Sequence, residues 1–262
     1  MTHSPQPASS DTEPPVPQPV PPGPRNLRTR LLDLFVTTAT VLEAAPIAAR
    51  MRRFRLGGEA LGSLKFVPGQ QLRILTGTEG RVGDPRTYSV WHFDPAAAVL
   101  DLCVLDHGEG PGSRWGRAVE VGDQVRFRGP TGSFTLRADA PYHLFAGEET
   151  AAVAFGAMLA ALPDDAPVYG AVETATAADR LPLPRAADLS HPLRGTASAA
   201  SSQVLVDAVR DLRLPDAPGV AYLAGEARTI QSLRRHLVEE RGWPRKSVVM
   251  KPFWTPGKKG LE

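Results

Sequence analysis

The sequence predicts a β + α/β protein, in which an antiparallel Greek-key barrel is followed by a parallel, Rossmann-like α/β domain. Before about residue 140, short β-rich runs are separated by Gly and Pro, which is typical of an antiparallel sandwich or barrel. After that point, apolar strands alternate with helical segments, as in a parallel sheet covered by helices. We therefore divide the chain into residues 1–28, 29–139 and 140–262.

The first segment is rich in proline. Nine of the first 24 residues are proline and none is aromatic, so this stretch cannot bury enough apolar surface to offset the entropy lost on ordering. We expect residues 1–28 to be a disordered tail, either a plain solvated segment or a proline-rich docking ligand.

The second segment contains the runs expected to form the barrel. The dipeptides Pro68-Gly69, Gly122-Asp123 and Gly129-Pro130 lie where tight turns would be needed between strands. The predicted strands are Phe35–Leu42, Arg50–Leu56, Gln70–Leu75, Thr87–Phe93, Val99–Leu105, Gln124–Arg128 and Ser133–Leu136.

The third segment alternates strands with helices. An Ala-rich stretch of good helix propensity follows its first apolar run and ends at Pro163. Residues 174–200 are expected to be a loop. The predicted order is strand Tyr142–Ala146, helix Thr150–Leu162, strand Val168–Val172, helix Gln203–Leu212, strand Val220–Ala224, helix Ala227–Arg241 and strand Ser247–Phe253.

Composition excludes several classes of function. The net charge of +2 is too near neutral to indicate nucleic-acid binding, and no apolar run approaches the roughly 20 residues that span a bilayer. The single cysteine, Cys103, excludes an internal disulfide framework and a cysteine metal site. No P-loop, H-E-x-x-H, paired C-x-x-C or G-x-S-x-G motif occurs. We expect a cytoplasmic monomer that binds neither nucleic acid nor membrane, and we assign no metal site and no catalytic side chain.

The segment Arg86-Thr87-Tyr88-Ser89 is the first candidate for ligand binding. On a strand, Arg86 and Tyr88 share one face while Thr87 and Ser89 share the other. A guanidinium suits a diphosphate, and a phenol ring suits stacking on an isoalloxazine, whose N5 a strand-end hydroxyl could hydrogen-bond. The alternative is an ordinary barrel strand with one exposed arginine.

The second candidate is the run His107-Gly108-Glu109-Gly110-Pro111-Gly112-Ser113-Arg114-Trp115. Its glycines allow the backbone to approach a ligand closely, and a helix is predicted to begin near Ser113. Amides at a helix N-terminus beside an arginine attract a diphosphate. The alternative is a plain turn, and a lone histidine at a strand end such as His107 is more often structural than ligand-binding.

Taken together, these segments resemble the siderophore-interacting protein family of the ferredoxin-reductase-like superfamily. An R-x-Y-S/T strand precedes a glycine-containing phosphate loop, and Gly147-Glu148-Glu149-Thr150-Ala151 resembles the D/E-E-T-A segment of that family. Ala224-Gly225-Glu226 and Leu233-Arg234-Arg235-His236-Leu237 resemble its A-G-E and R-R-x-L segments. The resemblance runs from about residue 32 to the end of the chain.

The resemblance implies a Greek-key FAD-binding barrel and a flavin held by named residues. Arg86, Thr87, Tyr88 and Ser89 would contact the flavin and ribityl end. Gly110, Gly112 and Ser113 would hold the diphosphate, with His107 closing the site. Glu149 and Thr150 would approach from the second domain, or the acids would only stabilise their helix terminus.

Two departures accompany the resemblance. The family has a second basic residue where this sequence has Trp91, so one contact is either missing or replaced by stacking. Standard ferredoxin reductases have a glycine-rich turn for the nicotinamide nucleotide where this chain has Glu148 and Glu149. Carboxylates at a helix N-terminus satisfy its dipole and repel a pyrophosphate, which makes nicotinamide binding at that turn doubtful.

The C-terminal region is basic. The chain has five lysines against 25 arginines, and four of the lysines are in the last 17 residues. Lys251, Lys258 and Lys259 are predicted to meet an anionic donor or substrate, or they form a solvated tail. Trp254, beside Phe253, would lie over the flavin or pack in the core.

The predicted function is FAD-dependent reduction of ferric siderophores. Electrons would come from NAD(P)H or ferredoxin and pass through the flavin, one at a time, to Fe(III), releasing Fe(II). The alternatives are a general NAD(P)H-dependent flavoprotein reductase with another acceptor and a non-catalytic, anion-binding barrel.

Overall fold

The computed structural model describes Met1 and residues 36–76 and 85–258. From Val36 onward the described residues belong to one compact unit. The predicted tail, apart from Met1, lies outside the described residues. Within the described ranges, every helix is too short or too polar to cross a bilayer.

The first half of this unit is a closed antiparallel barrel, with strands in the order β1-β2-β5-β4-β3-β6. Alternate side chains point inward and fill its interior, where Phe54 and Phe127 are fully buried. A short helix, α2 (Pro111–Ala118), joins β5 to β6, and a 3₁₀ turn (Glu59–Ser63) follows β2. The strands are β1 (Thr37–Ala48), β2 (Met51–Gly57), β3 (Gln71–Ile74), β4 (Arg86–Asp94), β5 (Val99–Leu105) and β6 (Gln124–Thr131).

The second half is a parallel four-stranded sheet in the order β10-β9-β7-β8. Its strands are β7 (His143–Glu148), β8 (Val168–Glu173), β9 (Val220–Glu226) and β10 (Val248–Trp254). Its helices are α3 (Glu149–Ala160), α4 (Gln203–Arg210) and α5 (Ala227–Arg235), with a π-helical turn at His236–Glu240 and 3₁₀ turns at Ala177–Asp179, Ala186–Asp188 and Arg245–Ser247.

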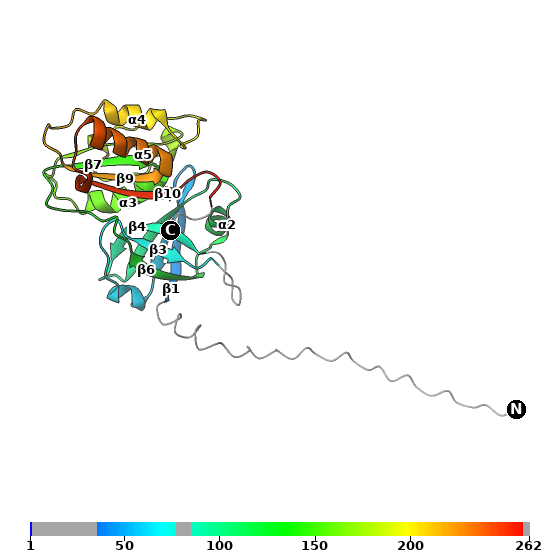
Figure 1. Ribbon diagram of the computed structural model, residues 1–262. Coiled ribbons are helices and arrows are strands. Elements are labelled where there is room, and N and C mark those ends of the chain that lie inside the picture. The colour runs from blue at the N-terminus through cyan, green and yellow to red at the C-terminus, as the bar shows by residue number, and fades with distance from the viewer. Residues whose placement is uncertain (2–35, 77–84, 259–262) are drawn as a thin grey trace. The chain divides into compact units, whose positions relative to one another are not determined.

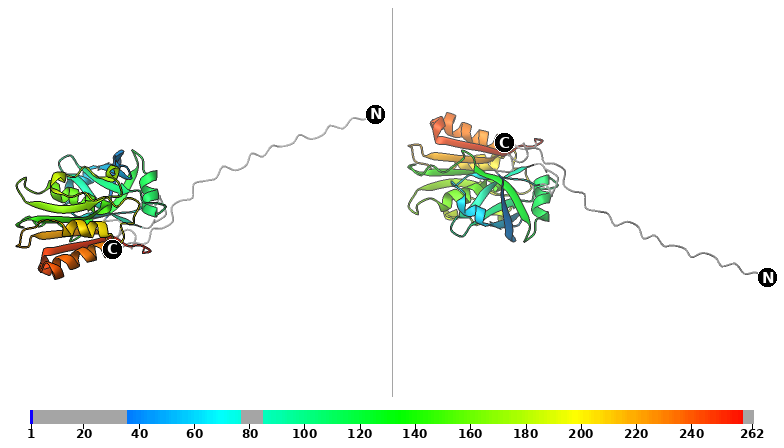
Figure 2. Two further views of the ribbon diagram at one scale, coloured as in Figure 1. Left: turned by 90° about the horizontal axis from the view of Figure 1, so that it is seen from above. Right: turned by 90° about the horizontal axis from the view of Figure 1, so that it is seen from below.

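The helices lie on opposite faces of this sheet. Helices α4 and α5 cover one face together, whereas α3 lies on the barrel side and packs against β4 and β5 (Figure 1). Figure 2 shows the same unit from above and from below. At the contact with the barrel, Trp91 of β4 packs on Gly156 of α3, where an added Cβ would lie 2.2 Å from the indole. Trp91, the residue at which the sequence departs from the family that it resembles, therefore packs between the two halves.

The predicted fold class is confirmed, although three elements differ from the prediction. Strand β1 continues past Leu42 to Ala48 and pairs with β2 beyond Pro46, which sits next to a register shift. The α-helix after β9 ends at Arg235 and continues only as the π-helical turn, rather than reaching Arg241.

The third difference is that Ser133–Leu136 forms no strand. Phe134 is instead 3% exposed and packs edge-on against Tyr222 and Phe253 of the sheet, with ring centroids 6.2 and 6.3 Å apart. A single backbone hydrogen bond joins Leu136 N–H to the carbonyl of Pro68. This apolar segment is buried because it packs between the barrel and the sheet. Its sequence pattern is the same as that of a strand, which is why a strand was predicted here.

Candidate functional site

A cavity of about 580 Å³ lies between the barrel and the carboxyl ends of the parallel strands, the edge where open α/β sheets bind ligands. Ser113 is not on its wall: this side chain is buried and its Oγ accepts a hydrogen bond from the amide of His107 at 3.2 Å. Lys259 lies outside the described residues. The cavity brings together the remaining predicted residues, which are Arg86, Thr87, Tyr88, Ser89, His107, Gly110, Gly112, Glu149, Thr150, Lys251, Trp254 and Lys258.

Strand β4 forms the barrel side of the cavity. The Tyr88 ring stacks on Trp115 of α2 at 5.6 Å, and the phenol stays protonated because burial raises its pKa. Gly112 lies against the Tyr88 hydroxyl, and a Cβ there would come within 2.7 Å of it. The close approach of strand and helix therefore requires glycine at position 112.

The N-terminus of α2 opens onto the same cavity. Its N-cap is Gly110, which offers no side-chain cap, and its first turn contains Pro111 and no acidic residue. Side chains thus leave the first-turn amides of α2 uncapped, and the helix dipole gives this end a partial positive charge. Arg86 lies on the adjacent wall. This arrangement suits a phosphate or diphosphate.

The N-terminus of α3, on the opposite wall, is already capped by a carboxylate. Glu148 ends β7 and accepts hydrogen bonds from Thr150 N at 2.9 Å and from Thr150 Oγ1 at 2.5 Å. It is 2% exposed. Gly225 leaves room for this carboxyl, since a Cβ at Gly225 would lie 2.6 Å from Glu148 Oε1. A phosphate at this helix end would meet a side chain that already occupies the amides.

The adjacent Glu149 is held by two arginines. Its carboxylate accepts from Arg194 Nη1 and Nη2 at 2.7 Å, from Arg50 Nη2 at 2.8 Å and from the amide of Ala175 at 2.9 Å. Burial alone would raise the pKa of Glu149, but the hydrogen bonds from Arg194 and the Ala175 amide, together with the charge of Arg194, outweigh burial, and the pKa is lowered. Arg50 also bonds Asp179, so the β1–β2 turn of the barrel is tied to the α/β half.

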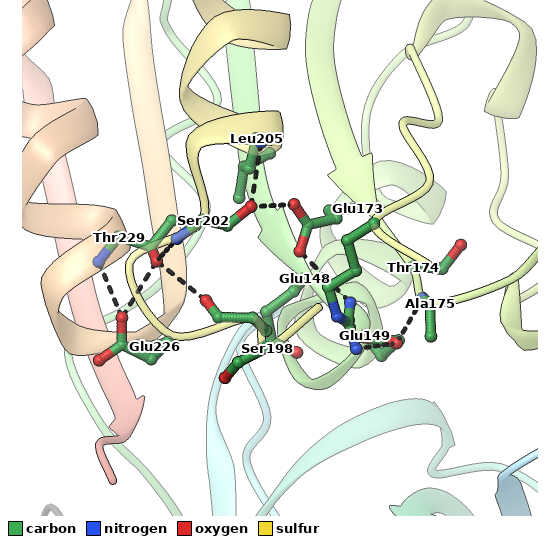
Figure 3. Close-up of polar contacts among 12 residues, drawn as sticks. Glu148, Glu149, Glu173, Thr174, Ala175, Ser198, Ser202, Leu205, Glu226 and Thr229 are labelled. Carbon is green, nitrogen blue, oxygen red and sulfur yellow. Dashed lines mark hydrogen bonds and ion pairs between the residues drawn. The ribbon is translucent and has the colours of Figure 1, made fainter. Parts of the chain in front are cut away.

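Carboxylates also end the neighbouring strands, as Figure 3 shows. Glu173, at the end of β8, accepts from the Ser202 hydroxyl and forms an ion pair with Arg194. Glu226, at the end of β9, caps α5 by accepting from Thr229 N at 2.9 Å and binds the amide of Ser201 at 3.0 Å. These contacts hold the segment before α4 across the edge of the sheet.

The end of β10 and the residue after it complete the wall. Trp254 Nε1 donates to Glu148 Oε1 at 2.9 Å, and the Thr255 hydroxyl donates to Glu226 at 3.3 Å. The Trp254 side chain thus lies at the cavity, whereas Phe253 packs on Phe134 as well as lining the cavity. Of the two aromatic residues, Trp254 is the one that is hydrogen-bonded to the N-cap residue of α3.

Three charged residues of the cavity wall were missing from the predicted set. Arg50, Glu148 and Arg194 all line the cavity. Glu148 carried a signal, because a glutamate directly before a helix is a capping position. Arg50 and Arg194 carried none, since their partner Glu149 is 99 and 45 residues away along the chain.

Comparisons with known proteins point to one class, the siderophore-interacting proteins. Residues 76–134 match the siderophore-interacting FAD-binding domain, and residues 140–257 match the siderophore-interacting protein family. The solved structures that resemble the chain include a siderophore utilization protein from T. fusca (TM-score 0.74, 25% identity, 87% of this chain and 95% of that one). The siderophore-interacting protein SipS from Aeromonas hydrophila resembles it similarly in fold (TM-score 0.73, 24% identity, 86% and 93%).

A curated relative leads to the same family. The ferric vibriobactin reductase ViuB of Vibrio cholerae is 30% identical over 185 residues, which cover 66% of this chain and 65% of ViuB. The aligned region thus spans just under two thirds of that relative's length. The chain belongs to the siderophore-interacting protein family, with a ferredoxin-reductase-like fold.

Proposed function

We propose that the cavity binds FAD and that the protein is an FAD-dependent reductase of ferric siderophores. The observation that carries the first half is the uncapped N-terminus of α2 beside Arg86, a cradle for a diphosphate. The family match to a FAD-binding domain and the name of the ViuB relative support the second half.

The residues present fit a flavin dinucleotide. The amides after Gly110 and the guanidinium of Arg86 would hold the diphosphate, and Gly112 lets the backbone approach without a side chain. Tyr88 and Ser89 would contact the ring and ribityl end, with Trp254 and Thr150 on the opposite wall. When bound, FAD would accept an electron pair and release electrons singly, which is the conversion that reduction of Fe(III) needs.

The charge of the cavity suits an anionic reaction partner. Two acids, Glu148 and Glu149, face a larger number of cationic residues on the wall, and the charge of Glu149 is balanced by its ion pairs. The cationic residues that line it are Arg50, Arg86, Arg194, Lys251 and Lys258. We propose that this excess attracts the ferric siderophore, or an acidic ferredoxin as donor.

The electron donor is proposed as NAD(P)H or ferredoxin. The Glu148 cap at α3 disfavours a nicotinamide pyrophosphate at that turn, which favours either a dinucleotide bound elsewhere or a protein donor. A cytoplasmic, monomeric state remains a prediction.

Anaerobic reduction followed by iron capture tests this function. The FAD-loaded protein is reduced in turn with NADH, NADPH and reduced ferredoxin, and is then mixed with ferric catecholate or hydroxamate siderophores beside a ferrous chelator. We expect Fe(II) to appear as the flavin is reoxidised. Reoxidation by quinones or free flavin, with no ferrous iron from any siderophore, would instead identify a general flavoprotein reductase.

A further inference from the structure

Glu148 is a buried acid on the cavity wall whose partners are all uncharged. In the described part of the chain, its hydrogen bonds come from Thr150 and the Trp254 indole, and no Lys or Arg forms an ion pair with it. The neighbouring Glu149, by contrast, forms ion pairs with both Arg50 and Arg194. Two adjacent carboxyls therefore stand in opposite environments at one helix terminus.

The surroundings of Glu148 and Glu149 shift the pKa values of the two carboxyls in opposite directions. Burial, followed by the charge of Glu149, raises the pKa of Glu148 to about 7 against the weaker opposing effect of its hydrogen bonds. The pKa of Glu149 is lowered, despite burial, by the hydrogen bonds and charge of Arg194 and by the amide of Ala175. Paired acids with pKa values pushed apart are a common basis of acid–base roles. The charged groups around Glu148 are Glu149 from α3, Glu173 from β8, Glu226 from β9, Lys251 from β10, Arg194 from the segment before α4 and Arg50 from the barrel.

Thr150 connects this carboxyl to the cavity. Its Oγ1 donates to Glu148 Oε1, and its side chain lines the cavity wall. A hydroxyl can accept one proton while it donates another. Thr150 is thus placed to pass a proton between the cavity and Glu148.

We propose that Glu148 is the proton-exchanging group of this cavity, working through the hydroxyl of Thr150. The proposal rests on the proposed function. A flavin that carries an electron pair also carries a proton on N5, which it loses when two ferric ions each take one electron. Thr150 would take that proton as it passes its own to the Glu148 carboxylate. The N5–H and Thr150 O–H bonds break, and new O–H bonds form on Thr150 and Glu148.

The protein without flavin gives the first test. Because Trp254 donates to Glu148, its fluorescence should change as Glu148 ionises, with a midpoint near pH 7. Glu148→Gln and Trp254→Phe should each abolish the transition. Glu226→Gln is the matched control, since Glu226 caps α5 in the same way but has a lowered pKa, and it should keep the transition. A parent protein with no transition, or a transition that survives Glu148→Gln, would overturn the proposal.

The loaded protein gives the second test. A carboxylate accepts a proton only when ionised, so the flavin-to-iron rate should rise about tenfold from pH 6 to pH 8 in the parent. Glu148→Gln and Thr150→Val should flatten this profile. If the pH titration holds but the protein binds no flavin, the proposed function is wrong and Glu148 is only a buried acid. If iron is reduced with the parental pH profile in Glu148→Gln, the function stands and the proton role is wrong.

Discussion

Two helices begin at the walls of one cavity, and they begin in opposite ways. Helix α2 starts at Gly110 with no side-chain cap and no acid in its first turn, whereas α3 starts at Glu148, whose carboxylate binds the amide and hydroxyl of Thr150. Both ends carry the partial positive charge of a helix N-terminus. The difference would direct a phosphate to a single side, because α2 has no side-chain cap on its first-turn amides, whereas Glu148 caps α3.

The largest expected effect on FAD affinity comes from placing an acidic residue at the N-cap of α2, as α3 has at its own N-cap. Gly110 has an ordinary φ of −65°, and a Cβ there would meet only His107, at 3.8 Å, so substitution is sterically allowed. Gly110→Asp should weaken FAD binding by about 2–3 kcal/mol, roughly a hundredfold in Kd, because like charges meet. Gly110→Ser, which can cap without charge, is the control for packing and should weaken it much less. Equal FAD affinity in the aspartate and serine variants would show that the diphosphate lies elsewhere.

The next effect concerns the arginine beside α2. Arg86→Ala should lower FAD affinity by about one to two decades, because a charge-assisted contact to a diphosphate contributes about 1.5–3 kcal/mol. Arg114→Ala is a matched control, since Arg114 is on α2 but away from the cavity and donates to the Glu109 carbonyl. Titration of the flavin-free proteins with FAD measures both. Matching affinities for these two variants would contradict the role of Arg86.

The smallest effect is expected at the C-terminal end of the cavity. Replacing Lys251 and Lys258 by Ala should lower kcat/KM for an anionic siderophore severalfold and flatten its salt dependence, because steering weakens as the Debye length falls to about 8 Å. Flavin content should stay near normal, which distinguishes the effect of these lysines from that of the substitutions in α2. Lys65→Ala with Lys246→Ala makes the same charge change elsewhere. If both pairs give parental salt dependence, the basic C-terminus is only a solvated surface.

Local sequence patterns predicted most of the architecture. The period-two runs predicted all six strands of the barrel. The change to an Ala-rich stretch at Thr150 predicted the position of α3. The pattern failed at Ser133–Leu136, since an apolar run that packs between two halves looks the same as a strand. Propensity does not report which surface a side chain meets.

The site was less predictable than the fold. Glycines and the Arg86 strand mark the barrel wall, because close backbone approach and anion binding need particular residue types. The ion pairs of Arg50 and Arg194 to Glu149 depend on tertiary placement, which the local sequence does not encode. Glu148 had a local signal as a helix cap, yet its raised pKa follows mainly from burial, which depends on tertiary packing against Gly225, and to a smaller extent from the charge of Glu149.

The central claim is that this cavity holds one FAD, with its diphosphate at the N-terminus of α2. The most direct measurement is the visible absorbance spectrum and flavin content of the purified protein, repeated after incubation with FAD and removal of the excess. We predict a non-covalent flavin spectrum at one FAD per chain in the parent and a large loss of flavin in Gly110→Asp. A folded parent protein that stays colourless after incubation with FAD would contradict the account.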